Sequence, residues 1–133
     1  APAAGKAKDS ATAVLTKGDI STVLVVDDEV ALCELAAIWL AAIGCKVTIA
    51  HSAAEALEHL ANKHYAILFT DIVMPGGMDG VELAKKALLL QTHLKVLITS
   101  GYADRLTKDE ELPGELISKP YRKIDLINAI SRL

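Results

Sequence analysis

Short runs of aliphatic residues alternate with longer amphipathic segments along most of the chain, and this alternation restricts the folds it can adopt. The aliphatic runs predict strands at 22–26, 46–50, 66–70, 95–99 and 115–118. The amphipathic segments predict helices at 29–43, 52–63, 79–90, 104–111 and 123–132. Strands and helices that alternate in this way predict a parallel sheet, because each pair of parallel strands needs a long crossover, usually a helix.

The predicted fold is a doubly wound, five-stranded parallel α/β sheet of the flavodoxin-like kind, with strand order 2-1-3-4-5 and helices on both faces. Ser52, with Glu55 three residues later, predicts a capped start for the helix at 52–63, and Gly44 predicts the end of the helix at 29–43. The helix at 104–111 is expected to be short or irregular, because its pattern is weak and Pro113 and Gly114 follow it.

Residues 1–20 have a different composition from the rest of the chain. They are rich in Ala, Lys, Ser, Thr and Gly and poor in large apolar residues, which predicts a linker or disordered tail. Residues 21–133 are then expected to form one folded domain. The chain starts at Ala1 rather than Met, which suggests processing or excision from a longer protein.

The composition favours an aliphatic core and excludes several classes of protein. Aromatic residues are few, with one Trp, three Tyr and one Phe in a chain that is 52% hydrophobic. Cys33 and Cys45 lie in apolar surroundings, which favours buried, reduced thiols over a disulfide or a metal site. A net charge of −3 with no basic face argues against direct nucleic-acid binding. No apolar run reaches the roughly 18–20 residues of a membrane span, and no signal peptide is evident, so we expect a cytoplasmic segment without membrane contact.

Polar residues follow four of the five predicted strands at the point where each strand ends. Asp27 and Asp28 follow the strand at 22–26, Asp71 the strand at 66–70, Ser100 the strand at 95–99, and Lys119 the strand at 115–118. The carboxyl ends of parallel strands lie at one edge of the sheet, where such folds bind their ligands. We therefore expect three carboxylates, a hydroxyl and an ammonium to converge there.

This set of groups predicts phosphoryl chemistry assisted by a divalent cation. Three neighbouring carboxylates repel one another unless a cation lies among them, and hard oxygen ligands suit Mg²⁺. No His or Cys lies at a matching strand end, which argues against zinc. A lysine and a hydroxyl beside Asp71 would suit a phosphoryl group carried by that carboxylate. Each motif alone has an ordinary explanation, such as a solvated loop for the Asp pair, and the joint order carries the inference.

The segments "VLVVDDE", "LFTDIVMPGGMDGVEL", "VLITSGYAD" and "ISKPY" resemble the signature blocks of the response-regulator receiver domain (CheY-like). The resemblance covers residues 21–133. It implies that Asp71 is the phosphoacceptor and that Asp28 and Asp71 ligate Mg²⁺ directly. It further implies that Asp27 acts mostly through water and that the backbone carbonyl of Val73 is the third protein ligand.

The resemblance also implies a switch and a partner. Ser100 would be the switch hydroxyl, and Lys119 would pair with the phosphoryl group. The donor would be a phosphohistidine on a sensor histidine kinase or on a histidine phosphotransfer protein. This segment would not be an enzyme, beyond assisting its own phosphorylation and dephosphorylation. The tail favours the C-terminal receiver of a hybrid sensor histidine kinase, with a stand-alone regulator as the alternative.

Some positions depart from the family pattern. Leu116 stands where many members carry an aromatic residue that rotates when the switch hydroxyl moves, and Tyr102 is a candidate replacement. The segment between Ser100 and Lys119 is short for the family, which weakens the expectation of dimerisation through this region and leaves the oligomeric state open. An additional glycine, Gly76 or Gly77, predicts a looser loop after Asp71.

Other residues border the predicted site or the predicted partner surface. Val73 and Tyr102 are expected to border the path of a hydrolytic water, where bulk would slow loss of the phosphoryl group. The helix at 29–43 is apolar over more than one stripe, which fits either a docking surface that includes Trp39 or simple burial. The four histidines, His51, His59, His64 and His93, are interpreted as surface residues away from the acidic cluster.

The sequence disfavours three alternative functions. A phosphatase of the haloacid dehalogenase type needs a second Asp two residues after its nucleophile, but Glu29 and Val73 occupy those places. A flavin- or nucleotide-binding module needs a Gly- or Ser/Thr-rich phosphate loop after the strand at 22–26, where this chain has acidic residues. A pseudo-receiver that acts only by protein binding is disfavoured by the intact set of site residues.

Overall fold

The computed structural model describes residues 21–101 and 112–133. The predicted tail at 1–20, the predicted helix at 104–111 and the role suggested for Tyr102 lie outside these residues.

The core of the structure is one parallel sheet of the predicted order. The strands are β1 (Thr22–Val26), β2 (Lys46–Ala50), β3 (Ile67–Asp71), β4 (Lys95–Ser100) and β5 (Glu115–Ser118). They are arranged β2-β1-β3-β4-β5, and every pairing between neighbours is parallel. In the register of β1 and β3, Val26 pairs with Thr70, so the next residues along both strands, Asp27 and Asp71, come to the same edge. The predicted fold class is therefore confirmed.

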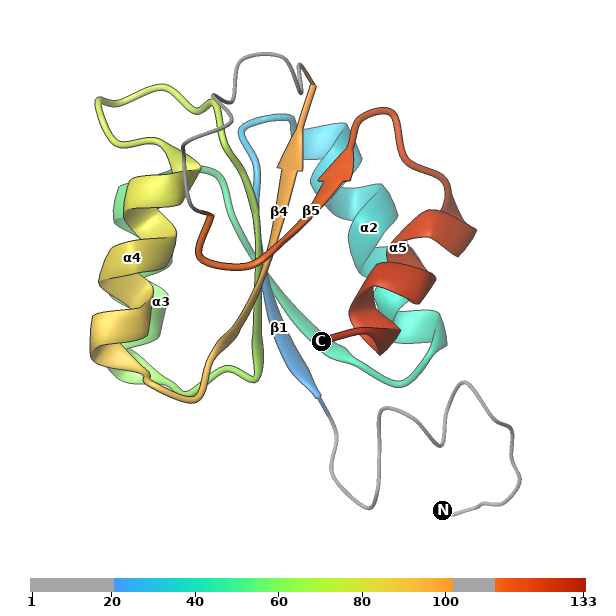
Figure 1. Ribbon diagram of the computed structural model, residues 1–133, viewed down its shortest axis with the longest axis horizontal. Helices are drawn as coiled ribbons and strands as arrows, with labels where there is room; N and C mark the ends of the chain where they lie inside the picture. The colour runs from blue at the N-terminus through green and yellow to red at the C-terminus, as the bar shows by residue number, and fades with distance from the viewer. Residues whose placement is uncertain (1–20, 102–111) are drawn as a thin grey trace.

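Among the described residues, four helices cover the sheet in two layers (Figure 1). They are α2 (Val30–Ala42), α3 (Ala53–Asn62), α4 (Gly80–Leu90) and α5 (Lys123–Ser131). The helices α3 and α4 lie on one face, and α2 and α5 lie on the other. No helix among the described residues is long and apolar enough to cross a membrane.

Local signals in the sequence account for most helix boundaries. Ser52 caps α3, where its Oγ accepts from the backbone N–H of Glu55 at 3.1 Å. The side chain of Glu55 accepts from the N–H of His51, the residue before the cap, rather than from the cap itself. Asp79 and Glu82 form a reciprocal capping box at the start of α4. Gly44 has a φ of 98°, the left-handed conformation that its position after α2 requires.

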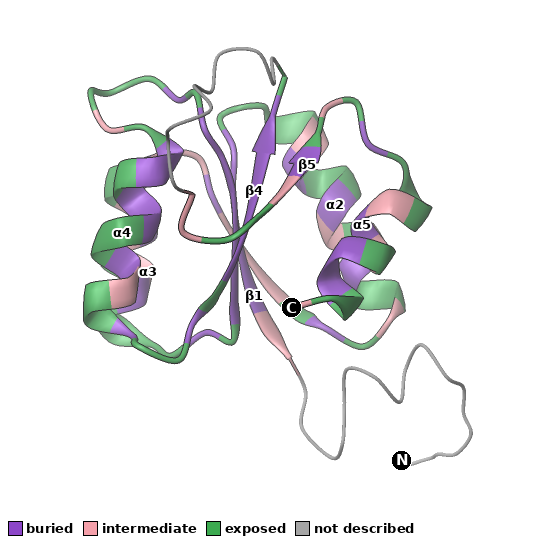
Figure 2. Ribbon diagram, viewed as in Figure 1, coloured by how far each residue is buried: buried purple, intermediate pink, exposed green. Residues whose placement is uncertain are grey.

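Two apolar clusters, one on each face of the sheet, form an aliphatic core as predicted. Figure 2 shows the buried residues concentrated in the strands and on the helix faces turned toward them. Cys33 and Cys45 are both buried free thiols, which confirms their interpretation from sequence. Three aromatic side chains meet on one face of the sheet, where Tyr121 packs edge-on against Phe69 and against Trp39, while Tyr65 lies in the cluster on the other face.

Candidate functional site

Three carboxylates converge at the carboxyl edge of the sheet. Asp27 and Asp28 follow β1, and Asp71 is the last residue of β3. Each offers an oxygen, and these oxygens all lie within 4.8 Å of one another. Asp27 and Asp71 are buried, while Asp28 is exposed. The cluster follows directly from the pairing of β1 with β3, because that pairing brings the ends of both strands together.

Lys119, the residue after β5, reaches back into this cluster. Its Nζ lies 3.0 Å from Asp27 Oδ2 and 3.2 Å from Asp71 Oδ2. A third carboxylate, that of Glu29, lies 3.1 Å from the same nitrogen. Only 16% of the Lys119 side chain is exposed, so these contacts are partly shielded from water. One ammonium therefore holds together negative charge from the ends of β1 and β3.

The acidic cluster perturbs the ionisation of its own members. Burial raises the pKa of Asp27, although the hydrogen bond from the backbone N–H of Glu29 and the contact with Lys119 oppose this shift. Burial also raises the pKa of Asp71, and the neighbouring charge of Asp27 raises it further. Burial alone would lower the pKa of Lys119, but its hydrogen bonds with Asp27 and Glu29 outweigh burial and raise that pKa. The ionised form of the buried carboxylates is therefore unfavourable in this cluster, and a bound cation would stabilise it.

The remaining predicted site residues lie around this cluster. Ser100 is the buried last residue of β4, and its carbonyl accepts from the N–H of Lys119 at 2.8 Å, which ties the two strand ends together. Val73 lies two residues beyond Asp71 and is 51% exposed. The loop that follows contains Gly76 and Gly77 with φ values of 100° and 88°, so both glycines adopt the conformation that disfavours side chains.

Gly80, the last residue of "MPGGMDG", has a steric role that the sequence did not reveal. Its Cα lies so close to Asp71 that a Cβ there would overlap the Asp71 carbonyl oxygen. Its N–H donates to the carbonyl of Ile72 at 2.7 Å. Gly80 therefore lets α4 begin directly against the end of β3, and this contact holds the main chain of Asp71 in place.

A model of the response regulator receiver domain matches residues 23–131. The chain belongs to this family. Among curated relatives, it is 38% identical over 93 residues to the response regulator receiver protein CpdR of Brucella abortus. This match covers 68% of the chain and 77% of CpdR. The transcriptional regulatory protein ZraR of Klebsiella oxytoca is longer. The match to it is 29% identical and covers 81% of this chain but 24% of ZraR.

Solved structures share the fold of this receiver domain. A CheY-like receiver domain protein from Methanospirillum hungatei is 29% identical, with a TM-score of 0.76 over 86% of this chain and 93% of that one. The response regulator TrrA from Thermotoga maritima, in complex with Mg²⁺ and BeF, is 24% identical. Its TM-score is 0.77 over 85% of this chain and 98% of TrrA.

Two residues of the receiver domain's site were missed from the sequence. The sequence marks Glu29 only as a residue that is not Asp, yet its carboxylate binds Lys119. The prediction that His51 lies away from the acidic cluster is wrong, because its Nδ1 lies 3.1 Å from the carbonyl oxygen of Asp27. His64 and His93 are exposed, and His59 is half-buried. Residue type gave no signal for the His51 contact, because its partner is a main-chain atom.

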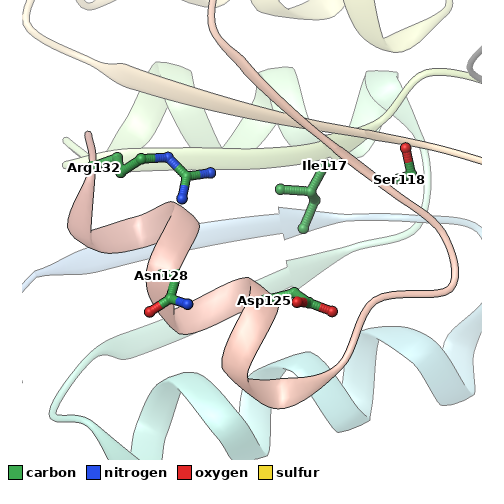
Figure 3. A pocket seen from close by; sticks show the side chains of 5 residues that line it. All are labelled: Ile117, Ser118, Asp125, Asn128 and Arg132. Atoms are coloured by element: carbon green, nitrogen blue, oxygen red, sulfur yellow. The ribbon is translucent and has the colours of Figure 1, made fainter.

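A hollow of about 520 Å³ opens beside the acidic cluster, between the start of α2 and the loop after β5. Its lining combines the polar groups of the site with apolar side chains: Glu29, Leu32, Leu35, Gly101, Lys119, Pro120 and Tyr121. A second hollow, of about 330 Å³, lies between β5 and α5, where Asp125, Asn128 and Arg132 project from the helix (Figure 3). The first hollow is the one that adjoins the candidate chemistry, because it is lined by Lys119, whose Nζ contacts Asp27 and Asp71, whereas the second is not.

Proposed function

We propose that this receiver domain takes a phosphoryl group from a phosphohistidine onto Asp71 and changes conformation in response. The observation that carries the proposal is the contact of Lys119 Nζ with the carboxylates of Asp27 and Asp71, beside Asp28, at one edge of the sheet. A buried carboxylate next to a fixed cation is suited to attack phosphorus and to hold the resulting phosphoryl oxygens.

The residues of the cluster fit Mg²⁺. Asp27, Asp28 and Asp71 offer hard oxygen ligands within reach of a single ion, and Val73 follows on the loop that could add its carbonyl. The related fold of TrrA was solved with Mg²⁺ and BeF. When bound, the ion would neutralise charge on the cluster and on the transferred group. Burial raises the pKa of both Asp27 and Asp71, which supports a requirement for such a cation.

The phosphoryl transfer forms one bond to phosphorus and breaks another. A carboxylate oxygen of Asp71 forms a bond to phosphorus as the bond from phosphorus to the donor's imidazole nitrogen breaks, and the electron pair of that bond stays on the nitrogen. Lys119, 3.2 Å from Asp71 Oδ2, stabilises the negative charge of the phosphoryl oxygens. The product carries about one additional negative charge and new acceptor oxygens.

The conformational response would begin at β4. Ser100 ends this strand beside Asp71, and we propose that its hydroxyl is drawn toward the new acceptor oxygens. The Ser100 carbonyl is bonded to the N–H of Lys119, so movement of β4 would be transmitted to the end of β5. Leu116 in β5 cannot act as the aromatic rotor found in many receiver domains, and we propose that the strand ends themselves move.

The phosphodonor would be a sensor histidine kinase or a histidine phosphotransfer protein, docked on α2 and the adjoining hollow. On α2, Leu35 is 41% exposed and Ile38 is 63% exposed, and Leu35 also lines the hollow beside Lys119. Trp39, by contrast, packs against Tyr121. The surface therefore supports the docking hypothesis through Leu35 and Ile38, while Trp39 belongs with the buried side of the helix.

The composition of residues 1–20 suits a linker, and we propose that the chain is a receiver domain of a hybrid histidine kinase, with a stand-alone regulator as the alternative. In either case this segment would act as a cytoplasmic phosphoacceptor rather than as an enzyme, without direct contact to nucleic acid.

Labelling with acetyl phosphate tests the central proposal. The wild-type chain should become phosphorylated in the presence of Mg²⁺, as detected by intact-protein mass spectrometry, and chelation of the metal should prevent it. The variant Asp71→Ala should remain unlabelled, while Glu58→Ala, at an exposed carboxylate on α3, should be labelled normally. An unlabelled wild-type protein would favour a pseudo-receiver that acts only through protein binding.

A further inference from the structure

The main-chain carbonyl of Asp27 lies within hydrogen-bonding distance of two side chains from different elements. The Nδ1 of His51, in the turn after β2, lies 3.1 Å from this oxygen. The thiol of Cys33, in α2, donates to the same oxygen at 3.2 Å. His51 is itself held in place, because its backbone N–H donates to Glu55 Oε1 at 2.8 Å. The carbonyl is thus clamped between the first turn of α2 and the turn that precedes α3.

The other polar atoms of Asp27 are also bound. Its N–H donates to the carbonyl of Ala50 at 3.2 Å, and its Oδ1 accepts from the N–H of Glu29 at 3.0 Å. Asp27 is only 3% exposed, so little water can reach its carbonyl, and an unpaired buried carbonyl would be costly. The donors from His51 and Cys33 satisfy both lone pairs of the oxygen.

The contact with His51 determines where the imidazole carries its proton. A carbonyl oxygen only accepts hydrogen bonds, so Nδ1 must be the protonated nitrogen. In the neutral ring, Nε2 is then the bare nitrogen. This assignment is a property of His51 that can be measured independently of any metal or phosphoryl group.

The clamp acts on the neighbouring residue through the planarity of the peptide unit. The Asp27 carbonyl and the Asp28 N–H belong to one planar group, so a fixed carbonyl fixes the direction in which the chain enters Asp28. Asp28 is the exposed member of the acidic cluster, and packing constrains its side chain less than it constrains Asp27 or Asp71. The main chain therefore has a large share in placing the Asp28 carboxylate.

We infer that His51 is a positioning residue for the acidic cluster, which it holds ready for Mg²⁺ through its hydrogen bond to the Asp27 carbonyl. Cys33 supports the same carbonyl from the other side. The inference rests on the proposed function, because it concerns affinity for the ion that the cluster would bind. Side chains that orient metal ligands from outside the coordination sphere commonly change metal affinity without contacting the ion.

Calorimetric titration of the full chain with Mg²⁺ tests this inference. His51→Leu removes the donor and should weaken Mg²⁺ binding about tenfold, the lower end of such outer-sphere effects. His51→Asn keeps a donor near the place of Nδ1 and should recover most of the affinity. His93→Leu, at an exposed histidine, serves as the control. Equal affinity in wild type and His51→Leu, or equal loss in the Leu and Asn variants, would overturn the inference.

Nitrogen NMR of the wild-type imidazole provides a test that needs no variant. At a pH where His51 is neutral, Nδ1 should be protonated and Nε2 bare, and the opposite tautomer would overturn the inference even if His51→Leu fails to fold. If the wild type binds Mg²⁺ and is labelled at Asp71 while His51→Leu binds equally well, only the role of His51 fails. If the wild type itself binds no Mg²⁺, the proposed function fails and this inference with it.

Discussion

Glu29 lies across the carboxyl edge of the sheet from Lys119, with its Oε1 3.1 Å from the lysine Nζ. The contact spans 90 residues of sequence and places a third carboxylate on the ammonium that also holds Asp27 and Asp71. The Glu29 side chain is 63% exposed, whereas those of Asp27 and Asp71 are 5% and 9% exposed. Of the three partners, Glu29 can therefore release Lys119 at the lowest cost.

The variant Glu29→Gln should be labelled by acetyl phosphate faster than the wild type at saturating Mg²⁺. Loss of one carboxylate frees Lys119 for the phosphoryl group and lessens repulsion of the anionic donor. An exposed ion pair contributes about 0–1 kcal/mol, so the gain should stay within about fivefold. Glu34→Gln changes an exposed charge on α2, the helix that Glu29 precedes, and serves as the control. A slower rate in Glu29→Gln would mean that Glu29 assists the transfer instead.

The sequence was sufficient to predict the fold and most of the acidic cluster, because the apolar runs mark the strands and the polar residues of the site stand where those runs end. Asp27, Asp71 and Lys119 each adjoin the end of an apolar run, and parallel pairing then places them together without further information. Glu29 was missed because its contact depends on the path of the chain after β1, which no periodicity encodes. His51 was missed because it binds a main-chain oxygen, which carries no residue-type signal.

The orientation of α2 shows a further limit of the sequence. This helix is apolar almost all round, so helical periodicity cannot indicate which residues face the sheet. The structure buries Cys33, Ala36 and Leu40 and leaves Ile38 exposed, because packing against β1, β2 and α5 selects that face. Docking and burial could therefore not be separated before the fold was known.

Val73→Asn should accelerate loss of the phosphoryl group from Asp71 by several-fold. Val73 is 51% exposed, two residues beyond Asp71, where its branched side chain can shield the phosphorus from water. Asn is polar and unbranched at Cβ and would admit a hydrolytic water. Leu90→Asn, at a residue that is 54% exposed near the far end of α4, is the matched control. The half-life of the phosphorylated protein is the measurement, and an unchanged half-life would exclude shielding by Val73.

Replacing either of two buried threonines on neighbouring strands by valine should change the stability of the fold, in opposite directions. Thr99 Oγ1 has no hydrogen-bond partner among the described residues, whereas Thr70 Oγ1 donates to the Asp71 carbonyl at 2.9 Å. Thr99→Val removes an unpaired buried hydroxyl and should raise the free energy of unfolding by about 1 kcal/mol. Thr70→Val breaks a buried bond and should lower it by about 1–3 kcal/mol. Urea denaturation measures both, and a destabilised Thr99→Val would show that its hydroxyl has a partner in solution.

Asp71→Asn should stabilise the metal-free protein at neutral pH. The folded pKa of Asp71 is raised above the ordinary value of 3.8 by burial and by the charge of Asp27, so the fold binds this proton more tightly than the unfolded chain. The stability that Asp71 contributes is therefore greatest below pH 3.8 and falls as pH rises through its raised pKa. Lys119 keeps Asp27 and Glu29 as partners in the variant.

The measurement for this prediction is the difference in free energy of unfolding between Asp71→Asn and wild type, followed across pH in the presence of a chelator. The difference should grow in favour of the variant from pH 3.8 upward and then level off above the raised pKa. Saturating Mg²⁺ should reverse it, because the ion stabilises only a cluster that retains its ligands. A variant that is less stable than wild type at neutral pH without Mg²⁺ would show that the contact with Lys119 outweighs the cost of burial.

Ile38→Asp should slow phosphotransfer from a histidine donor without changing labelling by acetyl phosphate. Ile38 is 63% exposed on α2, whose residue Leu35 lines the hollow that reaches Lys119, so a charge there would disrupt an apolar helix-to-helix contact. Small-molecule labelling uses only the acidic cluster and should be unaffected, which separates docking from chemistry. Leu89→Asp, at a residue that is 83% exposed on α4 across the sheet, is the control for an added charge. If Ile38→Asp and Leu89→Asp slow the histidine donor equally, α2 is not the surface that receives it.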